Sequence, residues 1–179
     1  MLASEDMDPV ELPSAKLLEA GLALASELSL ATVLQRTSHG STLSGMVHSW
    51  VLARADRARS WRFFKRTLES DLRDTQRGTT TEGIHLGAMA GTVDMIQRGY
   101  TGLELREDVL WLNPQLPDEL GGLEFDIRYR GHWGVRITVD HRRLEVSLRR
   151  AAAAAVRVGY RDSIVEIQPG GTWSTELPP

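Results

Sequence analysis

Two short stretches combine hydroxyl groups, a glycine and a histidine directly before a helical pattern. The first is Thr37–Ser44 and the second is Thr79–His85. The first four N–H groups of a helix lack partners within the helix, and the helix dipole adds partial positive charge there. A Ser-Thr pair at such a start can cap the helix or hold a phosphate with the same amides, and a nearby imidazole adds a donor. The two stretches therefore predict two helix N-termini suited to a small oxyanion.

Each candidate residue in these stretches also has a purely structural interpretation. Ser41 and Thr42 are ordinary N-cap residue types, and His85 can be a hydrogen-bonded interior histidine. We expect His39 to make structural hydrogen bonds. Glu82 is expected to cap its own helix or bind a sugar hydroxyl rather than donate a proton. The residues alone leave the capping and anion-binding interpretations open.

Helical hairpins are expected to carry both stretches. Apolar residues recur at helical spacing over 43–57 and again over 58–73. The helix expected over 83–98 has many small residues, which let backbones approach closely although each glycine lowers helix propensity. The cationic residues between 54 and 66 are expected to form a solvated outer face, because acidic residues follow at once and no aromatic interleaving suggests base stacking.

Composition and the start of the chain exclude several classes of protein. The net charge of −3 argues against a nucleic-acid or anionic-membrane binder, and the absence of cysteine excludes disulfides. Residues 1–13 are acidic and do not form a secretory signal, while an amphipathic helix is expected over 14–34. No run reaches the roughly 20 apolar residues of a membrane helix. We therefore expect a cytoplasmic protein, and with no close histidine pair we expect no metal site.

Strict apolar alternation marks the second half of the chain and predicts half-buried antiparallel strands. Six or seven such strands suggest a small sandwich. Trp133 continues the alternation of its strand and is expected to pack in the core, whereas His132 and His141 are expected at surface turns. The alanine tract 151–155 is expected to be a linker or irregular loop. The alternating segments are 123–129, 133–139, 144–148, 156–160 and 164–167.

Several motifs resemble those of a known enzyme family. They read RTSHGSTLS, VHSWVLARADRARSW and TTTEGIHLGAMAGTVDMIQRGYTG. These segments closely resemble glycoside hydrolase family 65, the inverting α-glucoside phosphorylases that include trehalose, maltose and kojibiose phosphorylases. The resemblance runs from about Arg36 to the end of the chain. It implies an α+β fold, in which the last helical hairpins of an (α/α)6 barrel precede a small antiparallel β-sandwich.

The resemblance implies three regions. Residues 1–35 are a divergent N-terminal segment with one helix, 36–102 a C-terminal fragment of the barrel domain, and 103–179 the β-sandwich domain. Which sugar such a protein uses is not contained in these residues.

The family's chemistry implies roles for the candidate residues. Phosphate attacks the anomeric carbon with inversion, so it replaces the water and base carboxylate of an inverting hydrolase. Such a site must orient phosphate through hydrogen bonds and positive potential. By matching motif, the resemblance implies that Ser41, Thr42 and His85 bind phosphate, with His39 and Glu82 as possible substrate contacts. No cofactor is expected besides inorganic phosphate as co-substrate.

The family's general acid lies upstream of the matching region, so this chain is expected to lack it and to be inactive alone. Three hypotheses remain open: the phosphate half of a phosphorylase or hydrolase site that another chain or a lost region completes, an inactive remnant, or a carbohydrate-binding or interaction module. Expected partners are a disaccharide or glucose 1-phosphate, a chain supplying the rest of the barrel, or a second copy that covers an exposed apolar face. Three acidic residues of the divergent segment offer no substitute acid: Glu11, Glu19 and Glu27.

Overall fold

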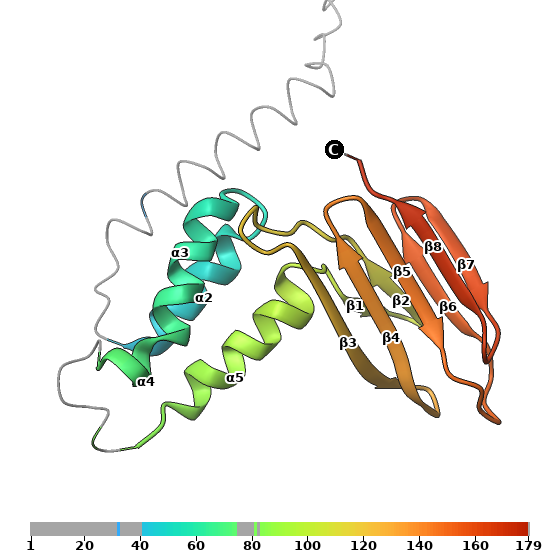
Figure 1. Cartoon of the computed structure of the whole chain (residues 1–179), viewed down its shortest axis with the longest axis horizontal. Coiled ribbons are helices and arrows are strands. Elements are labelled where there is room, and N and C mark those ends of the chain that lie inside the picture. Colours follow the sequence, from blue (N-terminus) through green and yellow to red (C-terminus); the bar gives the residue numbers. More distant parts are fainter. Residues whose placement is uncertain (1–31, 33–40, 75–80, 82, 179) are drawn as a thin grey trace, which may run out of the picture. The chain divides into compact units, whose positions relative to one another are not determined.

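The computed structural model of the chain describes residues 32, 41–74, 81 and 83–178 (Figure 1). The chain divides into two compact units, Met1–Ser38 and His39–Pro179. The helices and strands below all belong to the second unit. The helix expected over 14–34 lies outside the described residues apart from Thr32, which is helical.

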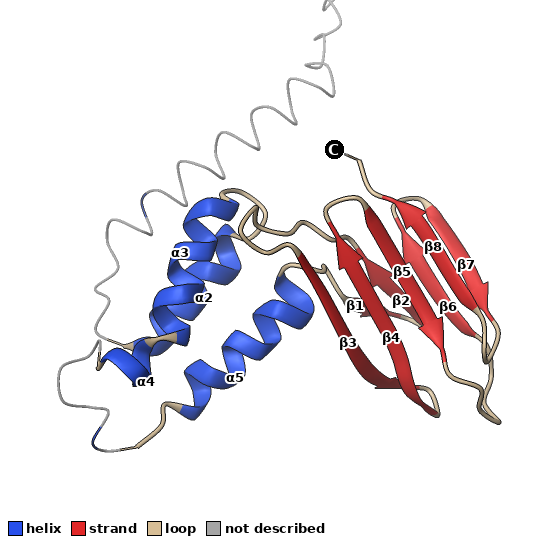
Figure 2. Cartoon of the chain, in the orientation of Figure 1, coloured by secondary structure: helices blue, strands red, loops and turns tan. Residues whose placement is uncertain are grey.

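The helical part of the second unit precedes all of its strands (Figure 2). The helix expected over 58–73 is divided in two at Glu69, and the helix expected from residue 83 begins only at Leu86. Gly83 has a φ of +122°, which lies outside the helical region, so the helix cannot include it. The elements are α2 (Thr42–Leu52), α3 (Arg57–Leu68), α4 (Ser70–Arg73), α5 (Leu86–Asp94) and the π-helical turn η2 (Met95–Gly99).

Helices α2 and α5 pack closely because α5 presents glycines to α2. A Cβ built on Gly87 would lie 3.2 Å from Leu43 Cδ2, and one built on Gly91 would lie 2.5 Å from Met46 Cγ. Both contacts advance along the two helices in the same direction, so α2 and α5 run parallel, as Figure 1 also shows. The expectation that small residues allow a close approach of backbones is confirmed.

Helices α2 and α3 form an antiparallel hairpin held by buried hydroxyl groups. Ser49 Oγ donates to the carbonyl of Ser60 over 3.0 Å, and Ser60 Oγ donates to the carbonyl of Ser49 over 2.7 Å. Both serines are fully buried, and so is Tyr100, whose hydroxyl lies 3.3 Å from Ser60 Oγ. Burial raises the pKa of Tyr100, so the phenol stays neutral in this interior. The hairpin is therefore closed by satisfied polar groups as well as by apolar contacts.

The strands form two four-stranded sheets within the described residues, stacked face to face in Figure 1. One sheet has the order β1-β2-β6-β7 and the other β3-β4-β5-β8. The predicted sandwich is confirmed, but the expectation of wholly antiparallel strands is wrong because β2 and β6 pair in parallel. The strands are β1 (Glu104–Arg106), β2 (Val109–Leu112), β3 (Gly122–Tyr129), β4 (His132–Asp140), β5 (Arg143–Leu148), β6 (Val156–Tyr160), β7 (Ser163–Ile167) and β8 (Thr172–Glu176).

A register shift at the start of β4 overturns two expectations about side chains. Ile127 pairs with Val135 but Tyr129 pairs with His132, so β4 carries one extra residue there. The extra residue turns His132 inward, where it is 1% exposed and its Nε2 lies 2.7 Å from the carbonyl oxygen of Ala154. Trp133 is turned outward and is 75% exposed. The expectations of a surface His132 and a core Trp133 are therefore both wrong.

One hydrophobic cluster joins the helices to the sandwich. It contains Met46, Phe64 and Met95 from the helical part together with Val135 and Val158 from the two sheets. A guanidinium N–H of Arg54 also donates to the carbonyl of Asn113, just after β2, over 2.6 Å. Among the described helices, none has the length and apolar character needed to cross a membrane.

Candidate phosphate-binding site

Ser41 is the N-cap of α2. Its Oγ accepts a hydrogen bond from the backbone N–H of Leu43 over 3.2 Å, and its carbonyl accepts one from Ser44 Oγ over 2.7 Å. Ser41 is exposed, whereas Thr42 is only 9% exposed. The capping interpretation of Ser41 is thus confirmed, and its hydroxyl also lies at an exposed helix start where anions are favoured.

His85 occupies the N-cap position of α5 and is held by a carboxylate from α4. The backbone N–H of His85 donates to Asp71 Oδ2 over 3.1 Å, and the ring nitrogen Nδ1 bonds to Asp71 Oδ1. The side chains are 27% exposed for His85 and 14% for Asp71. Asp71 is the partner that sequence reasoning missed, since it stood only as one of several acidic residues after α3.

The parallel packing of α2 and α5 brings these two helix starts to the same end of the helix pair. Leu43 follows Thr42 directly and lies against Gly87, which comes two residues after His85. The first turns of α2 and α5 contain no acidic residue of their own, and the carboxylate of Asp71, which lies at the start of α5, is bonded to the backbone N–H and the ring of His85. His39 and Glu82 lie outside the described residues, and their roles stay predictions.

The other histidines of the described part have structural or surface positions. His48 is buried and stacks on Phe63 with ring centroids 5.3 Å apart. His132 belongs to the core of the sandwich, and His141 is exposed on the turn between β4 and β5. Among the described residues, no cluster of three or more His, Asp or Glu side chains could hold a metal ion.

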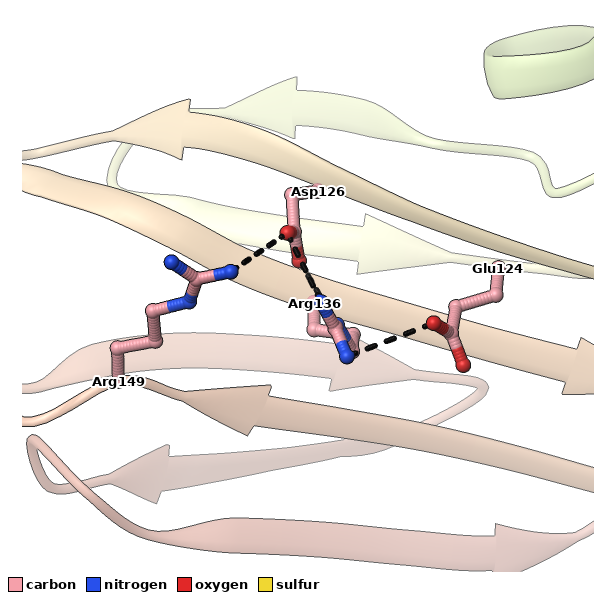
Figure 3. A network of polar contacts seen from close by, with 4 residues as sticks. All are labelled: Glu124, Asp126, Arg136 and Arg149. Atoms are coloured by element: carbon pink, nitrogen blue, oxygen red, sulfur yellow. Dashed lines mark hydrogen bonds and ion pairs between the residues drawn. The ribbon is translucent and has the colours of Figure 1, made fainter.

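The outer face of the β3-β4-β5-β8 sheet carries a network of charges (Figure 3). Arg136 donates to both carboxylate oxygens of Asp126 over 3.0 and 3.1 Å, and it lies 3.4 Å from Glu124. Arg149 also donates to Asp126 over 3.2 Å. These guanidinium groups, Arg136 first, hold the pKa of Asp126 below its usual range. The network is paired surface structure rather than a free acid–base group.

Comparisons with known proteins agree with this architecture. A family model for the glycosyl hydrolase family 65 central catalytic domain matches residues 26–94, and one for the family's C-terminal domain matches residues 103–167. A solved structure of a putative kojibiose phosphorylase from the human microbiome has a TM-score of 0.70 and 22% sequence identity, and the match covers 83% of this chain and 19% of that one. That likeness supports the fold.

Curated relatives extend the match. The chain is 47% identical to an uncharacterized glycosyl hydrolase of Mycobacterium tuberculosis over 78% of this chain and 10% of that protein. It is 35% identical to a trehalose 6-phosphate phosphorylase of Lactococcus lactis over 76% of this chain and 17% of that protein. The two family models together span well over half of the chain, which therefore belongs to a family of glycosyl hydrolases. It belongs to family 65, as the motifs predicted, and spans only a small part of these relatives' length.

Proposed function

We propose that this chain carries the phosphate-binding part of a family 65 phosphorylase site. The observation that carries the proposal is the parallel packing of α2 and α5, which sets Ser41, Thr42 and His85 at one end of the helix pair. The similarity to a trehalose 6-phosphate phosphorylase supports a phosphate-using reaction over simple hydrolysis. The helices are proposed to be the last hairpins of the (α/α)6 barrel.

The proposed reaction divides its chemistry between this segment and a second one. A phosphate oxygen attacks the anomeric carbon, the glycosidic bond breaks, and a general acid protonates the leaving oxygen. Ser41, Thr42 and His85 are proposed to hold the phosphate so that one oxygen faces the sugar. The general acid is proposed to come from the part of the relatives' length that this chain does not span.

Titration with inorganic phosphate tests the site directly. NMR of the histidine-labelled chain should show His85 ring signals that shift with phosphate, while the exposed His141 on the sandwich serves as the internal control. Ser41→Ala should weaken the response, because the hydroxyl and the ordered helix start are both lost. An unchanged His85 spectrum at saturating phosphate counts against the site.

An activity assay tests the division of the chemistry. The purified chain, mixed with phosphate and trehalose, maltose, kojibiose or nigerose, should release no glucose 1-phosphate, because no acid acts on the leaving oxygen. A coupled enzymatic assay for glucose 1-phosphate measures this. Robust release by the chain alone would contradict the proposal that the acid lies elsewhere.

The exposed side of α2 supports the proposal of a further partner. Leu43, Val47 and Val51 are 51%, 58% and 51% exposed and follow one another at helical spacing. Monomeric proteins rarely leave such a stripe open, so we propose that further barrel helices or a second copy cover it. Light scattering of the purified chain measures this, and a monomer at high concentration argues against self-association.

The exposed Trp133 favours a second candidate function, carbohydrate binding by the sandwich. Its ring lies on the outer surface with the guanidinium of Arg128 3.9 Å from the ring centroid. Pyranose rings stack on exposed indoles, and charged neighbours can bind their hydroxyls. Maltose should then quench tryptophan fluorescence in the wild type but not in Trp133→Ala, and equal quenching in both proteins rules this candidate out.

A further inference from the structure

We infer that Asp71 is a positioning residue that orients the imidazole of His85, so that its Nε2 atom faces the bound phosphate. The inference rests on the proposed phosphate site. Asp71 comes from α4, fourteen residues before His85, and it is not part of either motif that predicted the site.

One carboxylate holds His85 at two points. Asp71 Oδ2 accepts the backbone N–H over 3.1 Å and Oδ1 bonds to ring Nδ1, so both the main chain and the ring are fixed relative to α4. An ionised carboxylate can only accept hydrogen bonds. Nδ1 must therefore carry a proton, which leaves Nε2 as the nitrogen available to a ligand.

The burial of the two side chains agrees with this assignment. The carboxylate of Asp71 is the more covered partner at 14% exposure, while the imidazole keeps 27%. Nε2 has no hydrogen bond to any of the residues that the structure describes, and it is not among their buried polar atoms without a partner. The ring thus turns its Nδ1 edge toward the protein and keeps a solvent-accessible part for a ligand.

The available nitrogen decides what His85 does for phosphate. Monohydrogen phosphate carries one P–OH group, and an unprotonated Nε2 accepts its hydrogen bond. The unprotonated phosphate oxygens are then left for the helix amides and for the sugar. When Nε2 is protonated it donates to a phosphate oxygen instead, and the carboxylate of Asp71 stabilises the charged ring. In both states the contact to phosphate is made through Nε2.

A structural role for Asp71 is the competing explanation, since its bond to the His85 N–H also satisfies one amide at the start of α5. The two roles predict different things about the neutral tautomer of the His85 ring. If Asp71 only caps α5, it does not fix the tautomer, whereas if it also accepts from Nδ1, the ring carries its proton on Nδ1. Long-range ¹H–¹⁵N NMR distinguishes the two neutral tautomers of each histidine. Without phosphate at neutral pH, His85 should show the Nδ1–H tautomer, whereas the Nε2–H form predominates in an unconstrained histidine.

Variants of Asp71 extend the test to ligand binding. Asp71→Ala removes the acceptor, so His85 should revert to the Nε2–H tautomer and bind phosphate about tenfold more weakly, the usual loss for a charge-assisted hydrogen bond. Asp71→Asn has one amide oxygen and one NH2 group, so it cannot accept from both N–H groups of His85. Its oxygen should take the backbone N–H and its NH2 should donate to Nδ1, which favours the Nε2–H tautomer without loss of side-chain volume. Asp94→Ala is the matched control: its carboxylate lies on α5 and contacts Arg98 over 3.3 Å, so both readouts should stay unchanged.

Three outcomes separate the possibilities. An Nε2–H tautomer in the wild type overturns the inference without any variant, so the test survives even if Asp71→Ala does not fold. A folded Asp71→Ala chain with unaltered tautomer and phosphate affinity overturns it as well. A wild type with the Nδ1–H tautomer and no response to phosphate instead refutes the proposed phosphate site, while the orientation of the ring by Asp71 stands.

Discussion

Replacing Gly91 by alanine tests the packing that brings the two helix starts together. The new Cβ would lie 2.5 Å from Cγ of the buried Met46, an atom that can move only if χ1 of that packed side chain rotates. Overpacking of this kind costs about 1–3 kcal/mol, and an overlap this severe belongs to the upper half of that range. Alanine returns about 1 kcal/mol of helix propensity. The steric cost should exceed this gain, and Gly91→Ala should lower the free energy of unfolding by about 0.5–2 kcal/mol.

Gly87 on the same helix provides the matched control. A Cβ there would lie 3.2 Å from Leu43 Cδ2, the far end of a flexible side chain that can move away. Helix propensity should then dominate, and the stability of Gly87→Ala should be unchanged or raised by up to about 1 kcal/mol. Urea denaturation followed by circular dichroism measures both variants.

The refuting result is specific. If Gly91→Ala is as stable as the wild type, α5 does not lie against Met46 and the two helix starts are not held as described. A double-mutant cycle checks the cause: in the Met46→Ala background the cost of Gly91→Ala should largely disappear, because Met46 Cγ is then absent.

Three further predictions concern the caps and the sandwich. Ser41→Ala should lower the free energy of unfolding by about 1 kcal/mol through loss of the α2 cap, measured by urea denaturation; an unchanged stability means that the cap contributes nothing. Asp140 accepts N–H bonds from Arg142 over 2.7 Å and from Arg143 over 2.8 Å, which lower its pKa. Its stabilisation is thus present above the unfolded pKa of about 3.9 and is lost as the pH falls through the lower folded value. The stability gap between wild type and Asp140→Asn should shrink in acid, and a gap that is constant from neutral pH to pH ~2 contradicts this. Trp133→Ala should change stability by less than about 0.5 kcal/mol whereas His132→Ala should cost about 2 kcal/mol or more, and the reverse order in thermal denaturation contradicts the register shift.

The sequence predicted those parts of the fold that depend on local periodicity. Alternation over 123–129 and 144–148 identified β3 and β5, and the alanine tract 151–155 was correctly expected to be irregular. Local patterns do not record which strands pair, so the parallel β2–β6 contact was not predicted. The one-residue bulge in β4 was not predicted either, because an alternating pattern does not show where a bulge exchanges the inward and outward faces of a strand.

The candidate site was predictable only in part for the same reason. Ser41 stood out because a hydroxyl directly before an apolar helical pattern is a local signal, and the structure confirms it as the cap. The partner of His85 is not local. Asp71 comes from a separate short helix, and only the folded arrangement of α4 and α5 places its carboxylate against the ring.

The parallel pairing of β2 with β6 determines where this chain could be divided. The sheet that contains β6 and β7 draws its remaining strands from residues 104–112, directly after the helices. A piece that starts after Leu112 would leave β6 without a neighbour on one side and would expose its fully buried Val156 and Val158. An autonomous sandwich must therefore include β2 and begin before Val109, so this short strand close to the helices belongs to the sandwich and is more than a tether between the two parts.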